Sequence, residues 1–359
     1  MNDHHYIGLD VHKKWIFYCV ENENGKVLDE GRFPAEKAEI VRWCETKKAP
    51  WDGLMEATMF SAWIYDVMKP FAADLKVGHP YVMKRTLAAK NKSDRKDAKR
   101  FADLCRCKVI RTSYVMEPSL RALRRQMRLR AMLKRQVHQF KNRMAAVLME
   151  TGIAYDARKL HGKRYYSQLI RRADVEGEVA EIVQFCRERI QQLQAQQNKI
   201  FRKLEKHQLL QKRVELLRTI PGVGRITALT WALEVGDPNR FPSSSDAISY
   251  CGLVRAENQT AGKEKGGPLS KTRNHHLQHV LIEVGHLAPR FNQQLAAIQA
   301  KEAMTRKPNV VAIAVARKIV EYLMAVDRSG KPFQMRPPVV TEASSDAGAQ
   351  SPAATSSKI

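Results

Sequence analysis

The first third of the chain alternates short apolar runs with polar turns, a pattern typical of a mixed α/β domain. YIGLD at 6–10 and WIFYCV at 15–20 flank the polar turn VHKK, and a third candidate strand surrounds Lys26 to Phe33. Three apolar runs joined by short turns predict an antiparallel meander. The elements expected next are an amphipathic stretch at 36–47, a strand at 53–57, a helix near 60–71, a strand near 74–79 and a helix entered at about Asp94. We therefore expect an α/β domain over residues 1–112.

Two long helices are expected over residues 113–211. From about 117 to 150, apolar residues recur at steps of three and four, and the stretch from Pro118 to Met149 holds nine Lys and Arg residues and no acid. The stretch 178–217 keeps heptad spacing, interrupted by Gln197, His207 and Gln211. That spacing predicts one long helix in a coiled coil, with a helix packed inside a bundle as the alternative.

The C-terminal part is expected to be a mainly helical domain over residues 212–333, with a loop from Arg255 to Pro268. Its segment Pro221-Gly222-Val223-Gly224 lies between two helical patterns and indicates a helix-hairpin-helix motif. The glycines let backbone amides approach a phosphate, and the next helix begins with its positive dipole end towards it. The alternative is a simple Gly-rich turn. The tail, 334–359, is rich in Pro, Ser and Ala and is expected to be disordered.

The charge balance favours a nucleic-acid partner. The chain has 62 Lys and Arg against 37 Asp and Glu, a formal net charge of +25, and such an excess attracts polyanions. The alternatives are a merely soluble basic protein or one that binds anionic lipid. Six candidate phosphate contacts lie on the basic helix and in the C-terminal domain: Arg124, Arg128, Lys263, Lys265, Lys271 and Arg273.

The remaining composition narrows the class further. The six cysteines form neither Cys-x2-Cys pairs nor the framework of a disulfide-rich protein. His275, His276 and His279 have no cysteine or further ligand at a suitable distance, which argues against zinc. The N-terminus lacks the apolar core of a signal peptide, and no apolar run is long enough to span a membrane. We therefore expect a cytoplasmic protein in a reducing compartment.

Four carboxylates stand where strands end and a helix begins. Asp10 ends the first strand, Glu56 ends GLMEA, and Asp94 and Asp97 lie three residues apart at a helix start. Gathered together, they would hold the hard divalent cations Mg²⁺ or Mn²⁺ through oxygen ligands. Three hairpin strands followed by alternating helices and strands also match the order of RNase H-like folds. Taken singly, each acid has an ordinary alternative as a turn residue or as a complement to a helix dipole.

Three motifs carry a resemblance to a known family. YIGLD-VHKK, MEAT and KSDRKDAKRFADL resemble the Asp-Glu-Asp-Asp motifs of the RuvC-like transposases of bacterial insertion sequences, the group described as bridge-RNA-guided recombinases. The resemblance spans roughly residues 5 to 333. It implies an RNase H-like (RuvC-like) catalytic domain, element ends and target DNA as substrates, and a structured guide RNA as partner. It also implies a homodimer that assembles into a higher oligomer, with the coiled coil joining subunits.

The resemblance also implies a hydroxyl nucleophile in the C-terminal domain. In the transposases that this chain resembles, a Ser-rich stretch follows Gly-Leu and precedes an (Ile/Leu)-(Ser/Thr)-Lys-x-x-Asn helix start. Counting from Gly252 brings the position of the catalytic serine to Thr260, which keeps the hydroxyl but adds a methyl group beside it. Ser270 is the alternative nucleophile, although its position also suits a helix N-cap.

We therefore expect an insertion-sequence transposase that cleaves and transfers DNA strands through a covalent link at Thr260. One alternative is a hydrolytic nuclease, such as a junction resolvase, that uses water at the same metal site. Another is a nucleic-acid-binding relative with impaired chemistry. A kinase of the actin-like class would need further Gly-rich phosphate loops, and none stands between residues 110 and 215.

Overall fold

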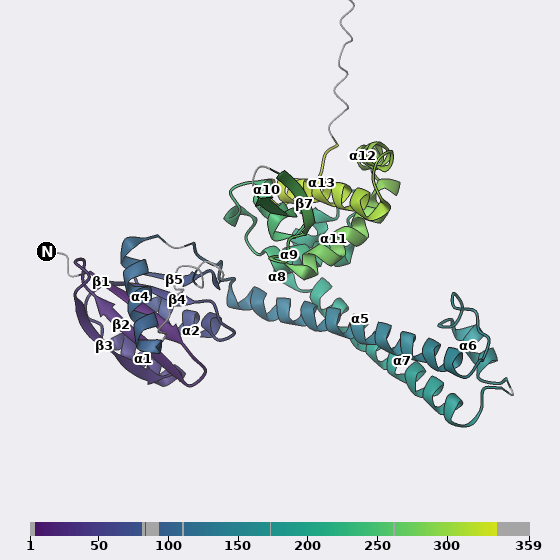
Figure 1. Ribbon diagram of the computed structural model, residues 1–359, viewed down its shortest axis with the longest axis horizontal. Helices are drawn as coiled ribbons and strands as arrows, with labels where there is room; N and C mark the ends of the chain where they lie inside the picture. Colours follow the sequence, from purple (N-terminus) through teal and green to yellow (C-terminus); the bar gives the residue numbers. More distant parts are fainter. Residues whose placement is uncertain are drawn as a thin grey trace, which may run out of the picture.

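The computed structural model describes residues 4–80, 83, 93–109, 111–172, 174–260 and 263–335, with the backbone alone between 256 and 266. Figure 1 shows an N-terminal α/β lobe, a C-terminal helical lobe, and a long pair of helices that projects away from both. The N-terminal α/β lobe and the mostly helical region after it confirm the coarse fold class, α/β followed by α. The predicted disordered tail lies outside the described residues except for its first two positions.

The N-terminal lobe is built on a five-stranded sheet of order β3-β2-β1-β4-β5. Strands β1 (His5–Val11), β2 (Trp15–Glu21) and β3 (Val27–Pro34) form an antiparallel meander, as the sequence predicted. Strands β4 (Trp51–Glu56) and β5 (Asp74–Gly78) then add parallel to β1. The central strand β1 therefore ends beside the end of β4.

Helices cover both faces of this sheet. Helices α1 (Lys37–Glu45) and α2 (Ser61–Met68), followed by the 3-10 turn η1 (Lys69–Phe71), pack on the face that carries Ile7 and Leu9. Helix α4 (Asp94–Cys107) packs on the other face through Ala98 and Phe101. Since side chains alternate along a strand, Gly8 and Asp10 both lie on the α4 face.

Gly8 allows α4 to lie directly on β1. A Cβ at this position would overlap the carbonyl oxygen of Ala98 and the amide nitrogen of Ala102, both in the backbone of α4. No side chain can therefore be accommodated unless the helix moves away from the sheet. The absence of a side chain at Gly8 fixes how close the first turn of α4 comes to the end of β1.

The projecting part is an antiparallel pair formed by α5 (Pro118–Glu150) and α7 (Gly177–Glu205). Phe140 lies against Phe185, and Arg130 lies over the ring of Phe201, so the two helices run in opposite directions. The connection contains α6 (Lys163–Leu169), which closes a small core at the far end. The buried residues of α7 thus pack within the chain, where α7 lies along α5.

The predicted single helix over 178–217 is wrong, because the chain breaks at Lys206 and His207. Helix α8 (Gln208–Leu217) begins there in a new direction and buries Leu210, Val214 and Leu217 in the C-terminal core. The heptad spacing continues across the break, so the apolar pattern alone gave no sign of the turn. At the start of α5, Arg121 forms an ion pair with Asp66 of α2. This contact joins the helix pair α5–α7 to the N-terminal lobe.

The C-terminal lobe surrounds α9 (Arg225–Val235), in which every residue after Ile226 is buried. Its other elements are the 3-10 turn η2 (Pro238–Arg240), α10 (Ser244–Tyr250), α11 (His275–Leu287), the 3-10 turn η3 (Ala288–Arg290), α12 (Gln293–Ala303) and α13 (Pro308–Ser329). Among the described helices, none is both long and apolar enough to cross a bilayer.

The loop predicted from Arg255 to Pro268 is a second error. Strands β6 (Arg255–Thr260) and β7 (Lys263–Leu269) form an antiparallel hairpin. Backbone pairing alone defines these strands, since RAENQT and KEKGGPL lack the alternation of apolar and polar residues by which a half-buried strand is recognised.

We expect Gly8→Ala to lower the free energy of unfolding by about 3 kcal/mol, since the methyl group forces α4 off the sheet. Urea unfolding of the full chain measures this change. Gly224→Ala is the control, because a Cβ there meets no atom within 4 Å and φ is negative. Equal stability of the two variants would contradict the close approach of α4.

Candidate active site

Asp10 lies at the end of β1, on the face that α4 covers, and is only 8% exposed. The last paired residues of β1 and β4 are Leu9 and Met55, so Glu56 follows on β4 at the level of Asp10. Leu54 packs with residues of α4, and the alternation of side chains places Glu56 on the same face. The ends of two parallel strands thus bring two of the four expected acids to one edge.

The other two acids come from the first turn of α4. Ser93 caps this helix by accepting a hydrogen bond from the Lys96 amide, at 3.4 Å, and Asp94 and Asp97 follow. Asp97 forms an ion pair with Arg100 at 3.0 Å, one turn further along. Acids in a first turn also complement the helix dipole, but this helix in addition directs them towards Asp10.

His12 completes the cluster, and the sequence reasoning missed it as part of a polar turn. Its Nε2 lies 3.1 Å from Oδ2 of Asp10 and 3.6 Å from Oδ1 of Asp94. The ligand atoms of these three residues all lie within 4.8 Å of one another. The signal that could have found it is the spacing of Gly8, Asp10 and His12, which places all three on one side of the strand and its extension.

The electrostatics of the cluster favour a bound cation. Burial raises the pKa of Asp10 to about 6, the His12 ring opposes this rise, and the charges of Asp94 and Asp97 add to it. Three carboxylates that repel one another, beside an imidazole nitrogen, make a donor set that fits a divalent cation. Such an ion would offset the cost of ionising Asp10 in a buried position.

The hairpin that carries Thr260 lies in the other lobe. Thr260 ends β6 and pairs across the turn with Lys263, while its side chain and those of Lys263 and Lys265 lie outside the described residues. Figure 1 shows the strand β7 in the C-terminal lobe, well separated from β1. The described fold therefore does not bring the hairpin and the acidic cluster together within one chain.

The segment after the hairpin differs from expectation. Ser270 is not the N-cap of α11, because it lies five residues before the helix begins at His275 and its hydroxyl accepts from the Thr272 amide at 3.2 Å. The cap is Asn274, which accepts from the amides of His276 and Leu277. Lys271 and Arg273, which lie between Ser270 and Asn274, are exposed. Arg273 also donates to the Ser270 carbonyl at 2.7 Å.

A buried carboxylate engages one of the two candidate arginines of α5. Arg128 donates twice to Glu234 of α9, at 2.7 and 2.6 Å, and Asn274 donates to the same carboxylate at 2.8 Å. Burial by itself opposes ionisation of Glu234, yet these bonds hold its pKa below the usual range. Arg128 thus joins α5 to the C-terminal lobe. At Arg124, burial and the adjacent charge of Arg128 lower the pKa, against an opposing effect of Glu234.

The turn between α8 and α9 has two glycines with different roles. Gly222 has a φ of +91°, and a Cβ there would lie 2.6 Å from the Cβ of Ala288, so glycine is needed for the turn itself. Gly224 begins α9 with no atom within 4 Å of a Cβ position. Of the four residues of this segment, Gly224 is exposed, Pro221 and Gly222 are partly buried, and Val223 is buried.

The acidic cluster leads to a pH-dependent expectation. Asp10 has a higher pKa in the folded chain than its ordinary value of 3.8, so between about pH 4 and pH 6 the folded state binds more protons than the unfolded state. Its contribution to stability therefore falls as the pH rises through this window. Relative to Asp10→Asn, we expect metal-free wild type to lose about 2 kcal/mol of unfolding free energy over this range, measured by urea unfolding.

At pH 7.5, Mn²⁺ should raise the melting temperature of wild type by several degrees and leave that of Asp10→Asn unchanged. Asp174→Asn is the control, because this exposed acid pairs with Arg172 between α6 and α7 and is not part of the cluster. A full Mn²⁺ shift in Asp10→Asn would remove Asp10 from the metal site.

Comparison with known protein families matches both lobes. Residues 7–153 match a family described as Transposase, of the DEDD type found in IS110 elements. Residues 214–299 match the family described as Transposase IS116/IS110/IS902 family. The two matches together cover more than half of the chain, including the acidic cluster and the hairpin.

Individual relatives agree with this result. The chain is 23% identical to the putative transposase y4qE of Sinorhizobium fredii, over 91% of this chain and 89% of that protein. It is 31% identical to the transposase of the insertion sequence element IS1328 from Yersinia enterocolitica, over 37% of this chain and 41% of that protein. It is 28% identical to the pilin gene-inverting protein of Moraxella bovis, over 35% of this chain and 40% of that protein. The chain belongs to the IS110/IS116 transposases of insertion sequences, enzymes that cleave DNA and transfer its strands.

Proposed function

We propose that Asp10, Glu56, Asp94 and Asp97, joined by His12, form an RNase H-like metal centre that holds Mg²⁺ or Mn²⁺ and acts on a DNA phosphodiester. The observation that carries this proposal is the convergence of Asp10 and Asp94 around His12, with their ligand atoms within 4.8 Å. The sheet order β3-β2-β1-β4-β5 supports the RNase H-like assignment, because it puts Asp10 on the central strand. The division into domains at 1–112, 113–211 and 212–333 belongs to the same proposal.

In this centre the chain's own residues orient the ion and the DNA. Asp10 and Asp94 would hold the cation, and the Arg100 pair orients Asp97 at its edge. A bound divalent ion supplies Lewis-acid chemistry at the scissile phosphate. The basic face of α5 and the helix-hairpin-helix turn at Gly224 would contact the DNA backbone without reading its sequence.

Strand transfer would run through Thr260. Its hydroxyl would lose its proton and form an O–P bond as the bond to the departing strand breaks, and the leaving oxygen would take up a proton. A DNA hydroxyl later attacks the same phosphorus and releases Thr260. The similarity to a protein named for inverting the pilin gene supports recombination rather than simple cleavage. By its family, the chain would also use a structured guide RNA and act as a homodimer or higher oligomer.

Hydrolysis by the acidic cluster alone is a second candidate function. The separation of the two lobes in Figure 1 favours it, since a water molecule could reach the cluster without the hairpin. A covalent protein–DNA intermediate distinguishes the two functions, because only strand transfer through a side-chain hydroxyl forms one.

We expect a covalent protein–DNA adduct when the full chain, its element RNA and end DNA are incubated with Mg²⁺. Thr260→Ala should abolish the adduct, and Thr260→Ser should retain it, because serine keeps the nucleophilic oxygen. Denaturing gel electrophoresis of labelled DNA measures the adduct. Cleavage without an adduct in any variant would favour hydrolysis, and an adduct that persists in Thr260→Ala would move the nucleophile elsewhere.

Since the two lobes lie apart, we expect a working centre to combine the acids of one subunit with the hairpin of another. Mixing Asp10→Ala with Thr260→Ala should then restore adduct formation, up to about one quarter of the wild-type level if subunits pair at random. Each variant alone serves as the control. Failure to complement, with both variants folded and able to bind DNA, would indicate a centre formed within one chain.

A further inference from the structure

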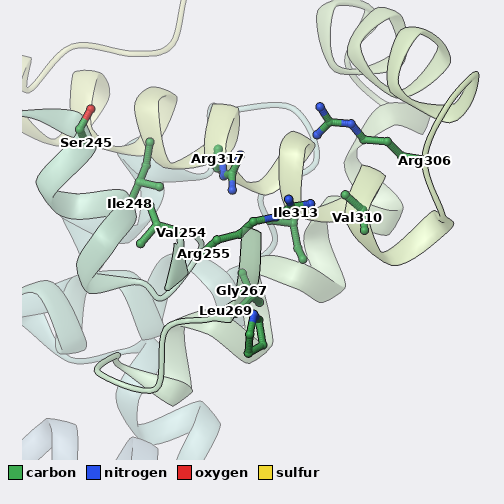
Figure 2. A pocket seen from close by; sticks show the side chains of 11 residues that line it. Ser245, Ile248, Val254, Arg255, Gly267, Leu269, Arg306, Val310, Ile313 and Arg317 are labelled. Carbon is green, nitrogen blue, oxygen red and sulfur yellow. The ribbon is translucent and has the colours of Figure 1, made fainter. Parts of the chain in front are cut away.

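The C-terminal lobe contains an open cavity of about 900 Å³ that none of the expected site residues lines. Helix α10, the two strands of the hairpin near its base, and helix α13 surround it, as Figure 2 shows. Its size falls within the range of sites that bind small molecules. The cavity therefore has room for a ligand much larger than a single ion.

Three arginines from three separate segments line this cavity: Arg255 at the start of β6, Arg306 between α12 and α13, and Arg317 within α13. Arg317 donates through Nε to the Leu253 carbonyl at 2.8 Å, which fixes its guanidinium. Arg306 pairs with Glu302 at 2.9 Å. The residues that line the cavity include no acid, and Glu302 beside it offsets one of the three arginine charges, so the cavity keeps a net positive charge.

The pKa of Arg317 is consistent with a position close to the two other arginines. Burial lowers its pKa, and the positive charges of Arg255 and Arg306 lower it further, against a smaller opposing effect of Glu302. Like charges held this close favour an anion between them. The planar guanidinium group is well matched to a phosphate, which it can bind through two parallel hydrogen bonds.

The same cavity also has an apolar side. Ile248 of α10, Val254 before the hairpin and Ile313 of α13 line it beside the arginines. An inorganic anion gains nothing from such a surface, whereas a nucleotide presents both a phosphate and a flat apolar base. A base inside a duplex is stacked on its neighbours and cannot enter, so the fitting ligand is unpaired.

We propose that this cavity binds one unpaired nucleotide of a nucleic-acid strand, with its phosphate on Arg255 and Arg317 and its base against Ile248, Val254 and Ile313. The inference deepens the proposed function, because Arg255 begins the strand that ends at Thr260. A strand anchored here would follow the hairpin towards the candidate nucleophile. Both DNA and RNA carry this chemistry, so the experiment has an arm for each.

The test measures binding by fluorescence anisotropy with the full chain in EDTA, where no cleavage occurs. The probes are a labelled DNA duplex, the same duplex with an unpaired tail, and an RNA duplex with and without such a tail. Wild type should bind a tailed probe about tenfold more tightly than its blunt counterpart, which is typical of one well-held base. The nucleic acid whose tail gives this preference is the source of the nucleotide.

Two kinds of variant distinguish the effect of the arginine charges from the effect of filling the cavity. Arg255→Gln and Arg317→Lys should reduce the preference for a tail, the first by removing a charge and the second by removing the planar group. Ile313→Trp fills the cavity at constant charge and should abolish the preference. Arg189→Gln on the exposed side of α7 is the control, since it removes one charge elsewhere and should keep the ratio of tailed to blunt affinity.

A wild-type ratio in both Arg255→Gln and Ile313→Trp would overturn the inference, as would the absence of any tail preference in wild type. Arg255 is exposed, so its replacement tests the site even if changes at Arg317 disturb the fold. Because the assay needs no metal and no chemistry, its outcome is independent of the adduct experiment. If wild type prefers a tailed probe but forms no adduct, the cavity binds a nucleotide and Thr260 is not the nucleophile.

Discussion

The contact of α4 with β1 at Gly8 is the constraint on which the candidate centre depends. Because the backbone of α4 occupies the space that a side chain at Gly8 would need, the helix lies directly on the strand. The first turn of α4 then reaches the end of β1, where Asp94 meets His12 and Asp10. The separation of these acids follows from the packing of one helix on one strand, and a small change at the glycine would propagate to all of them.

Electrostatics give the two lobes complementary roles. The chain carries a net charge of +25, yet its candidate metal centre gathers acids and raises the pKa of Asp10. A cation there would neutralise local repulsion and remain compatible with DNA attracted by the rest of the surface. In the C-terminal lobe the situation is reversed, since arginines converge on a cavity lined by no acid. One lobe thus favours a cation and the other an anion.

The bond of Arg128 to Glu234 shows why a basic helix cannot be interpreted by charge alone. This pair, with Asn274 on the same carboxylate, connects α5 to α9 and to the start of α11. Asn274 in turn caps the helix that follows the hairpin. These hydrogen bonds therefore connect the long helix pair to the start of α11, directly after the hairpin.

The sequence by itself determined the three-stranded meander, the order of the N-terminal elements, the long basic helix, and the positions of Asp10, Glu56, Asp94 and Asp97 at strand ends and a helix start. These follow from local periodicity and capping, which adjacent residues encode. Only the tertiary structure decided that α7 ends at Glu205, that RAENQT and KEKGGPL pair as a hairpin, that His12 joins the acids, and that Arg128 is bound to Glu234. The end of α7 and the bond of Arg128 to Glu234 depend on residues far away in the sequence, about which the local pattern holds no information. The hairpin and the place of His12 depend on backbone pairing and on the approach of α4, which periodicity alone does not show.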